Sequence, residues 1–493
     1  MRRAGLSLAV IALASVSAHA ATLRDALVQT YASNPTLTAA RAGLRATDET
    51  VGIAKAPGRP QASANGQFTR NYEKFGNLFE ANPLQGQAGG TVTVPIYQGG
   101  RVLNATRAAK ARVEAGRADL RGTEGDTFTN AVGAYMDVIR DISIVQLNAN
   151  NVKVLETNLQ ATKDRFQVGD VTRTDVAQSQ ARLSDSRTQL DSAQSQLTAS
   201  QENYLRIVGT VPNDLQAPPP LPTLPDTPDR AVEVALDNNP TLISIAAQVK
   251  AAHFDVGTAR GDRLPTLSAV GSGGYTHVFS GSDPLAGVYN NQVTASIGLQ
   301  ATVPLYQGGL VGAEVRRAQA LESQLLEQRV AVERQVIDNA RAAFASYHAA
   351  LAVIDSSQVA VNANTLALEG ARAENSVGTR TVLDVLNAEQ ELLNSQVQLV
   401  TAQHDAYVAG FALLNAMGQA EARYLGLDGG PLYDPTVNYN RVSKRISDWS
   451  DDPQPVTQAT RTVPAVVGTP QPPKIGPMPE PPPADSDVTA PRR

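Results

Sequence analysis

The sequence predicts a mixed α and β fold in which a few β-strands lead into long antiparallel coiled-coil helices. A seven-residue motif, V-P-[IL]-Y-Q-G-G, occurs at 94–100 and again at 303–309, which is 209 residues later. Before each copy, apolar and polar residues alternate as they do in a strand. After each copy, a pattern of helical period continues for about sixty residues. The chain is therefore an internal duplication of one strand-and-helix unit.

The composition excludes several classes of protein. The 493 residues carry a formal net charge of −5 and include no cysteine, which excludes disulfides, thiolate metal sites and a cysteine-linked lipid anchor. There is no apolar run long enough for a transmembrane helix and no basic block for a nucleic-acid partner. Arg2 and Arg3, an apolar stretch and Ala18-His19-Ala20 indicate a signal peptide. We expect an exported protein of a Gram-negative cell, in its periplasm or outer membrane.

The duplication also sets the expected domains. Asn34-Pro35-Thr36-Leu37 recurs as Asn239-Pro240-Thr241-Leu242, and each Asn-Pro pair is expected to interrupt a helix. Seven prolines between the halves predict an extended strap. The expected segments are a signal peptide (1–20), a first repeat (21–211), the strap (212–228), a second repeat (229–428) and a disordered Pro-rich tail (429–493).

Two strands are expected in each repeat. Residues 292–303 alternate almost without fault, residues 87–94 are a weaker equivalent, and 60–69 and 265–275 are the partner strands. One apolar face suits a tilted transmembrane strand of roughly 9–11 residues, although a soluble sheet with one wet face gives the same pattern. In a membrane, four strands cannot close a barrel, so the chain must oligomerise. Two chains would give a filled eight-stranded barrel, and three would give twelve strands around a lumen.

The repeated motif is expected to join the strands to the helices. Pro95 and Pro304 should end the strand pairing because proline has no N–H to donate. Glycine adopts left-handed backbone conformations without a steric penalty, so a glycine pair permits a sharp turn. The two glycine pairs are Gly99 with Gly100 and Gly308 with Gly309.

A long helix should follow each joint and end in a helical hairpin. In the second repeat, an apolar heptad seam runs from Ile337 to Ile354 inside a helix expected at about 311–374. The first repeat has the same seam 209 residues earlier, from Phe128 to Val145. Each helix should end at a tight turn with glycine just beyond its last residue. The predicted tips are Val168-Gly169 and Val377-Gly378.

Polar residues gather just after each tip. Thr172 with Asp175, and Thr381 with Asp384, have the spacing of a capping box. The same carboxylates, brought together from several chains at the narrow end of a helical tube, would form a ring that selects cations. Arg380 could bridge to Asp175 or Thr174 and hold neighbouring hairpins together.

The sequence gives no support for catalysis. The histidines are scattered singly, and no metal-ligand spacing, phosphate-binding loop or nucleophile motif occurs. We therefore predict no enzyme activity, no cofactor and no metal.

The paired N-P-T-L elements, the two V-P-[IL]-Y-Q-G-G joints and the run from Val377 to Asp384 resemble the TolC family of outer-membrane efflux proteins. The resemblance covers roughly residues 22–418. It implies a homotrimer, with a twelve-stranded barrel in outer-membrane lipid that continues into a periplasmic tunnel of twelve helices. It also implies a passive export duct, recruited by an inner-membrane ABC or proton-driven transporter through a periplasmic adaptor that docks at the hairpin tips.

The resemblance also implies roles for individual residues. Asp384 matches one aspartate of the family's aperture ring, whereas Asn387 stands at the position of the second. Arg380, Thr174 and Asp175 match links that hold the entrance closed, and Asn375 replaces the tyrosine of that set. Because it has no lipid-anchor cysteine, the chain resembles the branch of the family that serves protein secretion and general efflux. This favours a role in type I secretion. The alternatives are the channel of a multidrug efflux pump and, in another class, a periplasmic coiled-coil adaptor or scaffold.

Overall fold

A computed structural model describes residues 22–70, 72–75, 78–81, 84–279, 291–427 and 432–461. The predicted signal peptide at 1–20 and the last part of the predicted tail lie outside these residues. The first repeat contains α1 (Leu23–Ser33), α2 (Pro35–Lys55), a 3-10 turn η1 (Ala56–Gly58), β1 (Gln61–Thr69), β2 (Tyr72–Phe75), β3 (Leu78–Ala81), β4 (Leu84–Gln98), α3 (Arg101–Gln167) and α4 (Arg173–Val208). The second contains α5 (Pro228–Asn238), α6 (Pro240–Gly261), β5 (Thr266–Phe279), β6 (Asn291–Thr302), α7 (Leu310–Ser376) and α8 (Val382–Ala416), and α9 (Pro435–Val442) follows.

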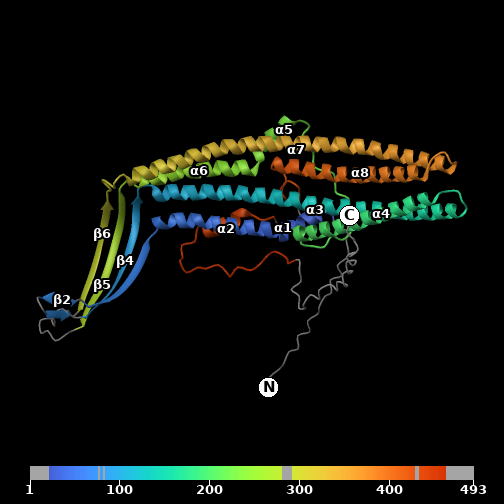
Figure 1. Cartoon of the computed structure of the whole chain (residues 1–493). Helices are drawn as coiled ribbons and strands as arrows, with labels where there is room; N and C mark the ends of the chain where they lie inside the picture. Colours follow the sequence, from blue (N-terminus) through green and yellow to red (C-terminus); the bar gives the residue numbers. More distant parts are fainter. Residues whose placement is uncertain are drawn as a thin grey trace, which may run out of the picture. The chain divides into compact units, whose positions relative to one another are not determined.

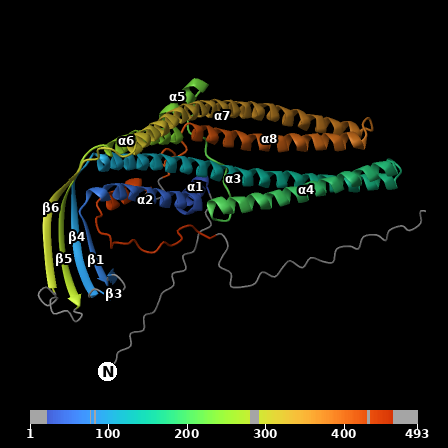
Figure 2. The same ribbon diagram turned by 60° about the vertical axis from the view of Figure 1, so that its left-hand side comes forward.

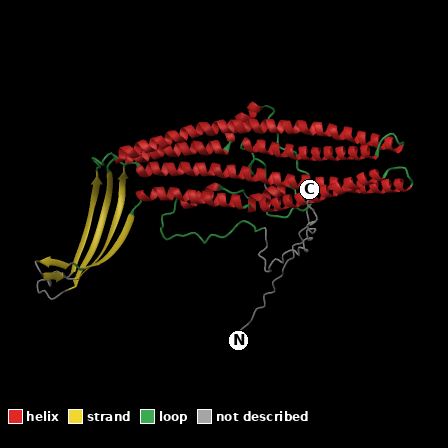
Figure 3. Ribbon diagram, in the orientation of Figure 1, coloured by secondary structure: helices red, strands yellow, loops and turns green. Residues whose placement is uncertain are grey.

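The long helices lie side by side, and the sheet continues from one end of them (Figures 1 to 3). α3 and α7 each have 67 residues, which is about 100 Å at a rise of 1.5 Å per residue. α4 returns along α3, and α8 returns along α7. The shorter helices α2 and α6 pack against α3 near the sheet. The mixed fold class and the internal duplication predicted from the sequence are confirmed.

The Asn-Pro pairs divide the short helices in both repeats. The Asn34 side chain accepts a hydrogen bond from the Thr36 N–H, and Asn239 accepts one from the Thr241 N–H, each at 2.9 Å. Each asparagine also donates to the last turn of the returning helix in its own repeat. Asn34 binds the Ile207 carbonyl at 2.8 Å, and Asn239 binds the Ala416 carbonyl at 3.0 Å. Each asparagine therefore caps the helix that follows it and also binds the end of the returning helix of its repeat.

The main sheet is antiparallel, in the order β1-β4-β5-β6. Its register places apolar and small residues on one face and polar ones on the other. β4 is longer than the predicted 87–94, because residues 84–86 and 95–98 at its two ends also pair with β5. A separate β2-β3 hairpin lies in the segment between β1 and β4, which the sequence left as a loop.

The two joints differ in the position of the proline relative to the strand pairing. β6 ends at Thr302, so Pro304 follows the pairing as predicted. The prediction for Pro95 is wrong, because β4 continues through it to Gln98 and pairs with β5 across a bulge between Pro95 and Tyr97. β1 ends opposite Thr93, so β4 has only one partner strand at Pro95. A missing N–H is tolerated at such an edge and at a bulge.

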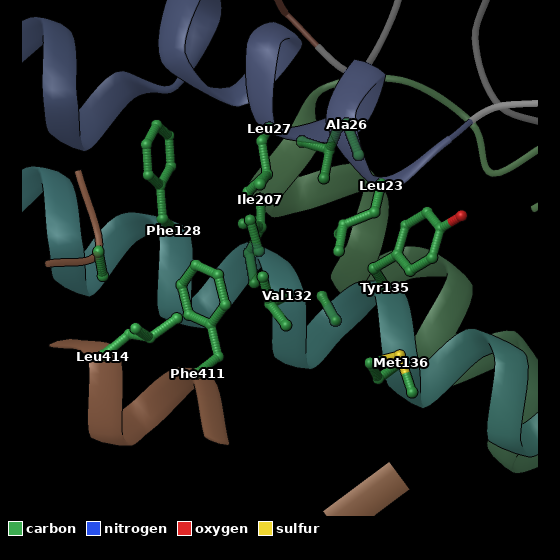
Figure 4. Close-up of a cluster of buried hydrophobic side chains, with 14 of the residues drawn as sticks. Leu23, Ala26, Leu27, Phe128, Val132, Tyr135, Met136, Ile207, Phe411 and Leu414 are labelled. Atoms are coloured by element: carbon green, nitrogen blue, oxygen red, sulfur yellow. The ribbon is translucent and has the colours of Figure 1, made fainter. Parts of the chain in front are cut away.

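The core lies where α1, α3, α4 and α8 meet (Figure 4). The first heptad seam supplies Phe128 and Tyr135, both fully buried, and α8 supplies Phe411 and Leu414 from the opposite side. The Tyr135 hydroxyl donates to the Gln216 carbonyl at 2.6 Å, which holds the Pro-rich strap against the core. The aromatic seam thus anchors the segment that joins the repeats.

The corresponding long helices differ in burial. α3 has 22 buried residues and α7 has seven, although both have the same length. On the second seam only Ala340 is buried, and Leu351 is exposed. α3 packs against helices of both repeats, whereas much of α7 is covered by nothing in the described part of the chain. Most of the first copy of the seam is buried in the core, whereas most of the second copy is only half-buried.

The predicted disordered tail at 429–493 is wrong for its first part. Asp434 caps α9, which packs against α2, and the Asn438 amide donates to buried Asp48 at 2.8 Å. The Arg41 guanidinium stacks on the rings of Tyr31 and Tyr433, with its carbon 4.3 and 5.2 Å from the ring centroids. A helix of eight residues shows little periodicity, so composition alone suggested disorder.

The two joints differ in the space around their first glycine, and this difference can be tested. Gly99 and Gly308 both have φ of +60°, but a Cβ at Gly99 would lie 2.4 Å from the Gly261 carbonyl oxygen, whereas one at Gly308 would have open space around it. Gly308→Ala should cost about 1–2 kcal/mol from the left-handed backbone. Gly99→Ala should cost clearly more, as measured by chemical unfolding of the purified protein. Equal losses would show that the contact with Gly261 is unimportant.

Candidate functional site at the hairpin tips

The two hairpin tips have the same backbone geometry. Gly169 and Gly378 have φ of +82° and +81°, and each lies two residues beyond the last residue of its helix. The Asp170 N–H donates to the Arg165 carbonyl at 2.9 Å, and the Thr379 N–H donates to the Glu374 carbonyl at 3.0 Å. This closing turn leaves Val168 and Val377 80% and 74% exposed.

Both predicted capping boxes are present. In α8 the Thr381 hydroxyl accepts from the Asp384 N–H at 3.3 Å, and the Asp384 carboxylate accepts from the Thr381 N–H at 3.1 Å. Thr172 and Asp175 repeat the arrangement at the start of α4. The hydrogen bonds from Thr381, more than the charge of Arg380, hold the pKa of Asp384 below its usual range. Asp384 is therefore an ionised carboxylate at neutral pH.

Arg380 has a different partner from the one predicted for it. Within one chain its guanidinium binds the Glu374 carboxylate of the same hairpin at 2.5 Å, and not Asp175 or Thr174. Asn375, which stands in place of the family's tyrosine, contacts both hairpins within the chain. Its amide donates to the Arg380 carbonyl at 2.8 Å, and its oxygen accepts from Arg165 of the other hairpin at 3.4 Å. Thr174 is exposed.

A buried carboxylate that the sequence did not reveal joins the hairpins. Glu389 is buried and accepts from the Asn158 amide at 2.8 and 3.0 Å and from Arg372 at 3.1 Å. These side chains come from α8, α3 and α7. Glu389 lies among other glutamate and glutamine residues of α8, so nothing in its spacing distinguishes it from a surface residue.

Two further contacts connect the hairpins near the tips. The Arg182 side chain of α4 donates to the Asn387 oxygen of α8 at 2.8 Å, so Asn387 is an interhelical partner within the chain. A small apolar cluster contains Val152, Leu155 and Leu159 of α3, Leu183 of α4 and Leu386 of α8. The predicted tip residues and Glu389 thus belong to one region in which both hairpins meet.

The sheet provides the second functional surface. On its apolar face, Ile297 is 92% exposed, so nothing in the described chain covers it. The opposite face, over the described strand residues, carries hydroxyl, amide, glycine and valine positions but no charged side chain. Ser272 and Ser296 form a hydroxyl pair on it at 2.7 Å. Such a surface is suited to contact with water.

Aromatic residues mark both ends of the apolar face. Phe68 and Phe279 pack over Gly86 with ring centroids 6.3 Å apart, at the end farther from the long helices. Tyr97 pairs with Leu267 at the helical end. An apolar band between two aromatic rows is typical of outer-membrane strands. None of the helices in the described part of the chain is long and apolar enough to cross a membrane.

Strands of this kind that continue into long helical hairpins define an outer-membrane channel protein. The family model for outer membrane efflux proteins matches residues 26–210 and 231–419. The chain is 34% identical over 430 residues to outer membrane efflux protein BepC of Brucella suis, covering 86% of this chain and 91% of BepC. It belongs to the outer membrane efflux protein family, of the TolC type, whose members are channels and not enzymes, and it is located in the outer membrane.

Other relatives agree with this assignment. Outer membrane protein TolC of Escherichia coli is 26% identical over 458 residues, which cover 88% of this chain and 91% of TolC. The alkaline protease secretion protein AprF of Pseudomonas aeruginosa is 27% identical, over 60% of this chain and 62% of AprF. The solved structure of CusC has a TM-score of 0.70 at 16% identity, covering 80% of this chain and 91% of CusC, and shows the same fold.

Glu389 should contribute to stability. Glu389→Ala removes the hydrogen bonds that the buried carboxylate accepts from half-buried Asn158 and from Arg372, whose side chain is 50% exposed. Because these bonds involve charged groups, the free energy of unfolding should fall by about 1–3 kcal/mol. Exposed Glu391, two residues away on α8, is the matched control, and Glu391→Ala should change it by less than about 0.5 kcal/mol. Denaturant unfolding of both variants provides the comparison. If both variants changed the free energy of unfolding by the same small amount, Glu389 would not stabilise the contact between the hairpins.

Proposed function

We propose that three copies of the chain form an exit duct that conducts proteins or small molecules passively from an inner-membrane transporter to the exterior. The main support is the sheet, which has an uncovered apolar face and open edges at β1 and β6. Open edges are not tolerated in lipid, so β1 of one copy would pair with β6 of the next. Three copies give twelve strands and a lumen, whereas two give a filled interior in which the polar face would lack water.

The exposed side of α7 supports the same assembly. Val359 and Leu366, one heptad apart on α7, are 68% and 70% exposed in one chain. Helices of neighbouring copies would cover them and complete a periplasmic tunnel. A soluble coiled-coil scaffold would also use such helices, but it would leave the aromatic-bounded face of the sheet without a role.

The tips would form the gate of this duct. In the assembly, Arg380 would exchange Glu374 for Asp175 or Thr174 of a neighbouring hairpin, and rotation of the hairpins would open the entrance. Asp384 of each copy would contribute one carboxylate to an aperture ring. The exposed Val168 and Val377 would contact a periplasmic adaptor.

The names of the relatives indicate the class of cargo. AprF is named for protease secretion, which favours type I secretion with an ABC transporter. BepC is named for efflux, so the channel of a multidrug pump is the second candidate. The uncharged polar face of the sheet would let cargo of either charge pass, which suits extended polypeptides of varied sequence.

Conductance tests the duct and its gate. Wild-type protein in a planar bilayer should show a small resting conductance that rises several-fold in Arg380→Ser. If Arg380 acts between copies, Asp175→Asn should raise the conductance as well and Glu374→Gln should not. The reverse result would assign the gate to the bond within one hairpin. Folded protein without conductance in any form would contradict the proposed function.

Ion selectivity tests the aperture ring separately from the helix cap. Asp384→Asn keeps a side-chain oxygen for the Thr381 N–H but removes the charge, so cation preference and block by divalent cations should both fall while thermal stability changes little. Asp175→Asn makes the same change in the other hairpin and should leave selectivity unchanged. Unaltered selectivity in Asp384→Asn would reduce this carboxylate to a helix cap.

A further inference from the structure

The chain after α9 presents two large apolar side chains to solvent. Trp449, the single tryptophan of the sequence, is 96% exposed, and Ile446, three residues before it, is 77% exposed. A tryptophan on a monomer's surface usually keeps part of its ring covered. Neither side chain belongs to the tips, the core or the polar face described above.

The loop that carries them is fixed in place. Asp452 accepts a pair of hydrogen bonds from Arg441 at 2.7 and 2.8 Å and a third contact from Arg445 at 2.8 Å. These bonds connect the last turn of α9 to both ends of the segment 445–452, which closes it as a loop. Inside the loop, the backbone N–H of Trp449 donates to the Ser447 hydroxyl at 3.3 Å. The exposed side chains therefore lie on a defined loop and not on a free end.

The loop begins at the base of the sheet. The Lys55 ammonium, at the end of α2, donates to the Ser443 carbonyl at 3.1 Å. Arg59, two residues before β1, donates to the Arg445 carbonyl at 3.0 Å. In Figures 1 and 2 the chain after α9 turns beside the start of β1 before it runs back along the helices. This is the end of the sheet at which Tyr97 lies on the apolar face.

We propose that Ile446 and Trp449 insert into the periplasmic leaflet of the outer membrane and anchor the base of the sheet in phospholipid headgroups. The inference rests on the proposed function, in which the apolar face of the sheet is in lipid. Tryptophan favours the membrane interface because its ring is apolar and its N–H is polar. Lys444 and Arg59 supply cations near the loop for phosphate groups, and Asp448 and Asp451 suit the ammonium groups of zwitterionic lipid.

Lipid fits the loop better than a protein partner does. In the described segment 445–452 the exposed large apolar side chains are Ile446 and Trp449. Two side chains are far less than the roughly 800 Å² per partner that a stable protein interface buries. The loop also lies at the end of the sheet that carries Tyr97, where headgroups would begin in the proposed assembly. An anchor here would fix the height of the sheet in the membrane from outside the barrel.

The single tryptophan makes the test direct. We would reconstitute the full-length protein in bilayers of phosphatidylethanolamine and phosphatidylglycerol, with and without bromine on the acyl chains, and record tryptophan emission. Trp449 in contact with lipid should emit at shorter wavelength than in the unfolded chain and lose most of its intensity in brominated lipid. Full intensity in brominated lipid would overturn the proposal, and blue-shifted emission without quenching would show that protein covers the ring instead.

Two controls use a Trp449→Phe background. Ile297→Trp on the apolar face of the sheet should be strongly quenched, and Val168→Trp at the hairpin tip should not be. If Ile297→Trp is quenched and Trp449 is not, the membrane anchor is wrong and the proposed function stands. If neither is quenched in folded protein, the sheet is not in lipid and the proposed function fails with it.

Discussion

The sheet exposes an apolar face that no described element of the chain covers, and this constraint governs the rest of the structure. Ile297, Val293 and Leu299 all lie on it, and each such side chain gains roughly 1.5–3 kcal/mol when it leaves water. Helices could have covered the face, as they do in soluble proteins, but every long helix instead continues away from the end of the sheet. The favourable environment is therefore not supplied by the described elements of the chain. Lipid on one face and neighbouring strands at both edges satisfy this requirement together.

The joints allow a sheet of this kind to continue into helices without a separate domain between them. Gly99 with Gly100, and Gly308 with Gly309, adopt positive φ, so the chain changes direction within two residues. The first joint is tightly packed against Gly261, whereas the second is open. Neighbouring copies would meet at the open joint, so one joint is supported by its own chain and the other is available for assembly.

Much of this fold could be predicted because its signals are local. The Asn-Pro breaks, the glycine turns and the capping boxes depend on a few adjacent residues, and the duplication shows each of them twice. What depends on distant partners was missed. The Glu389 carboxylate is satisfied by Asn158 and Arg372, which reach it from other helices. α9 packs on α2, where Asp48 accepts from Asn438 and Arg41 stacks on Tyr433 just before the helix. Pro95 was misplaced for the same reason, since its tolerance depends on where β1 ends.

The unequal burial of α3 and α7 has a consequence for genetics. A damaging substitution on α3 disturbs the core of its own subunit, so the altered chain would be lost to misfolding and degradation before it meets intact copies. A damaging substitution on the exposed side of α7 leaves the subunit folded and acts only after assembly. When altered and normal chains are made together, the first kind would be recessive and the second dominant. Two corresponding stretches of one gene would thus differ in whether their damaging alleles are dominant or recessive in cells that make both chains.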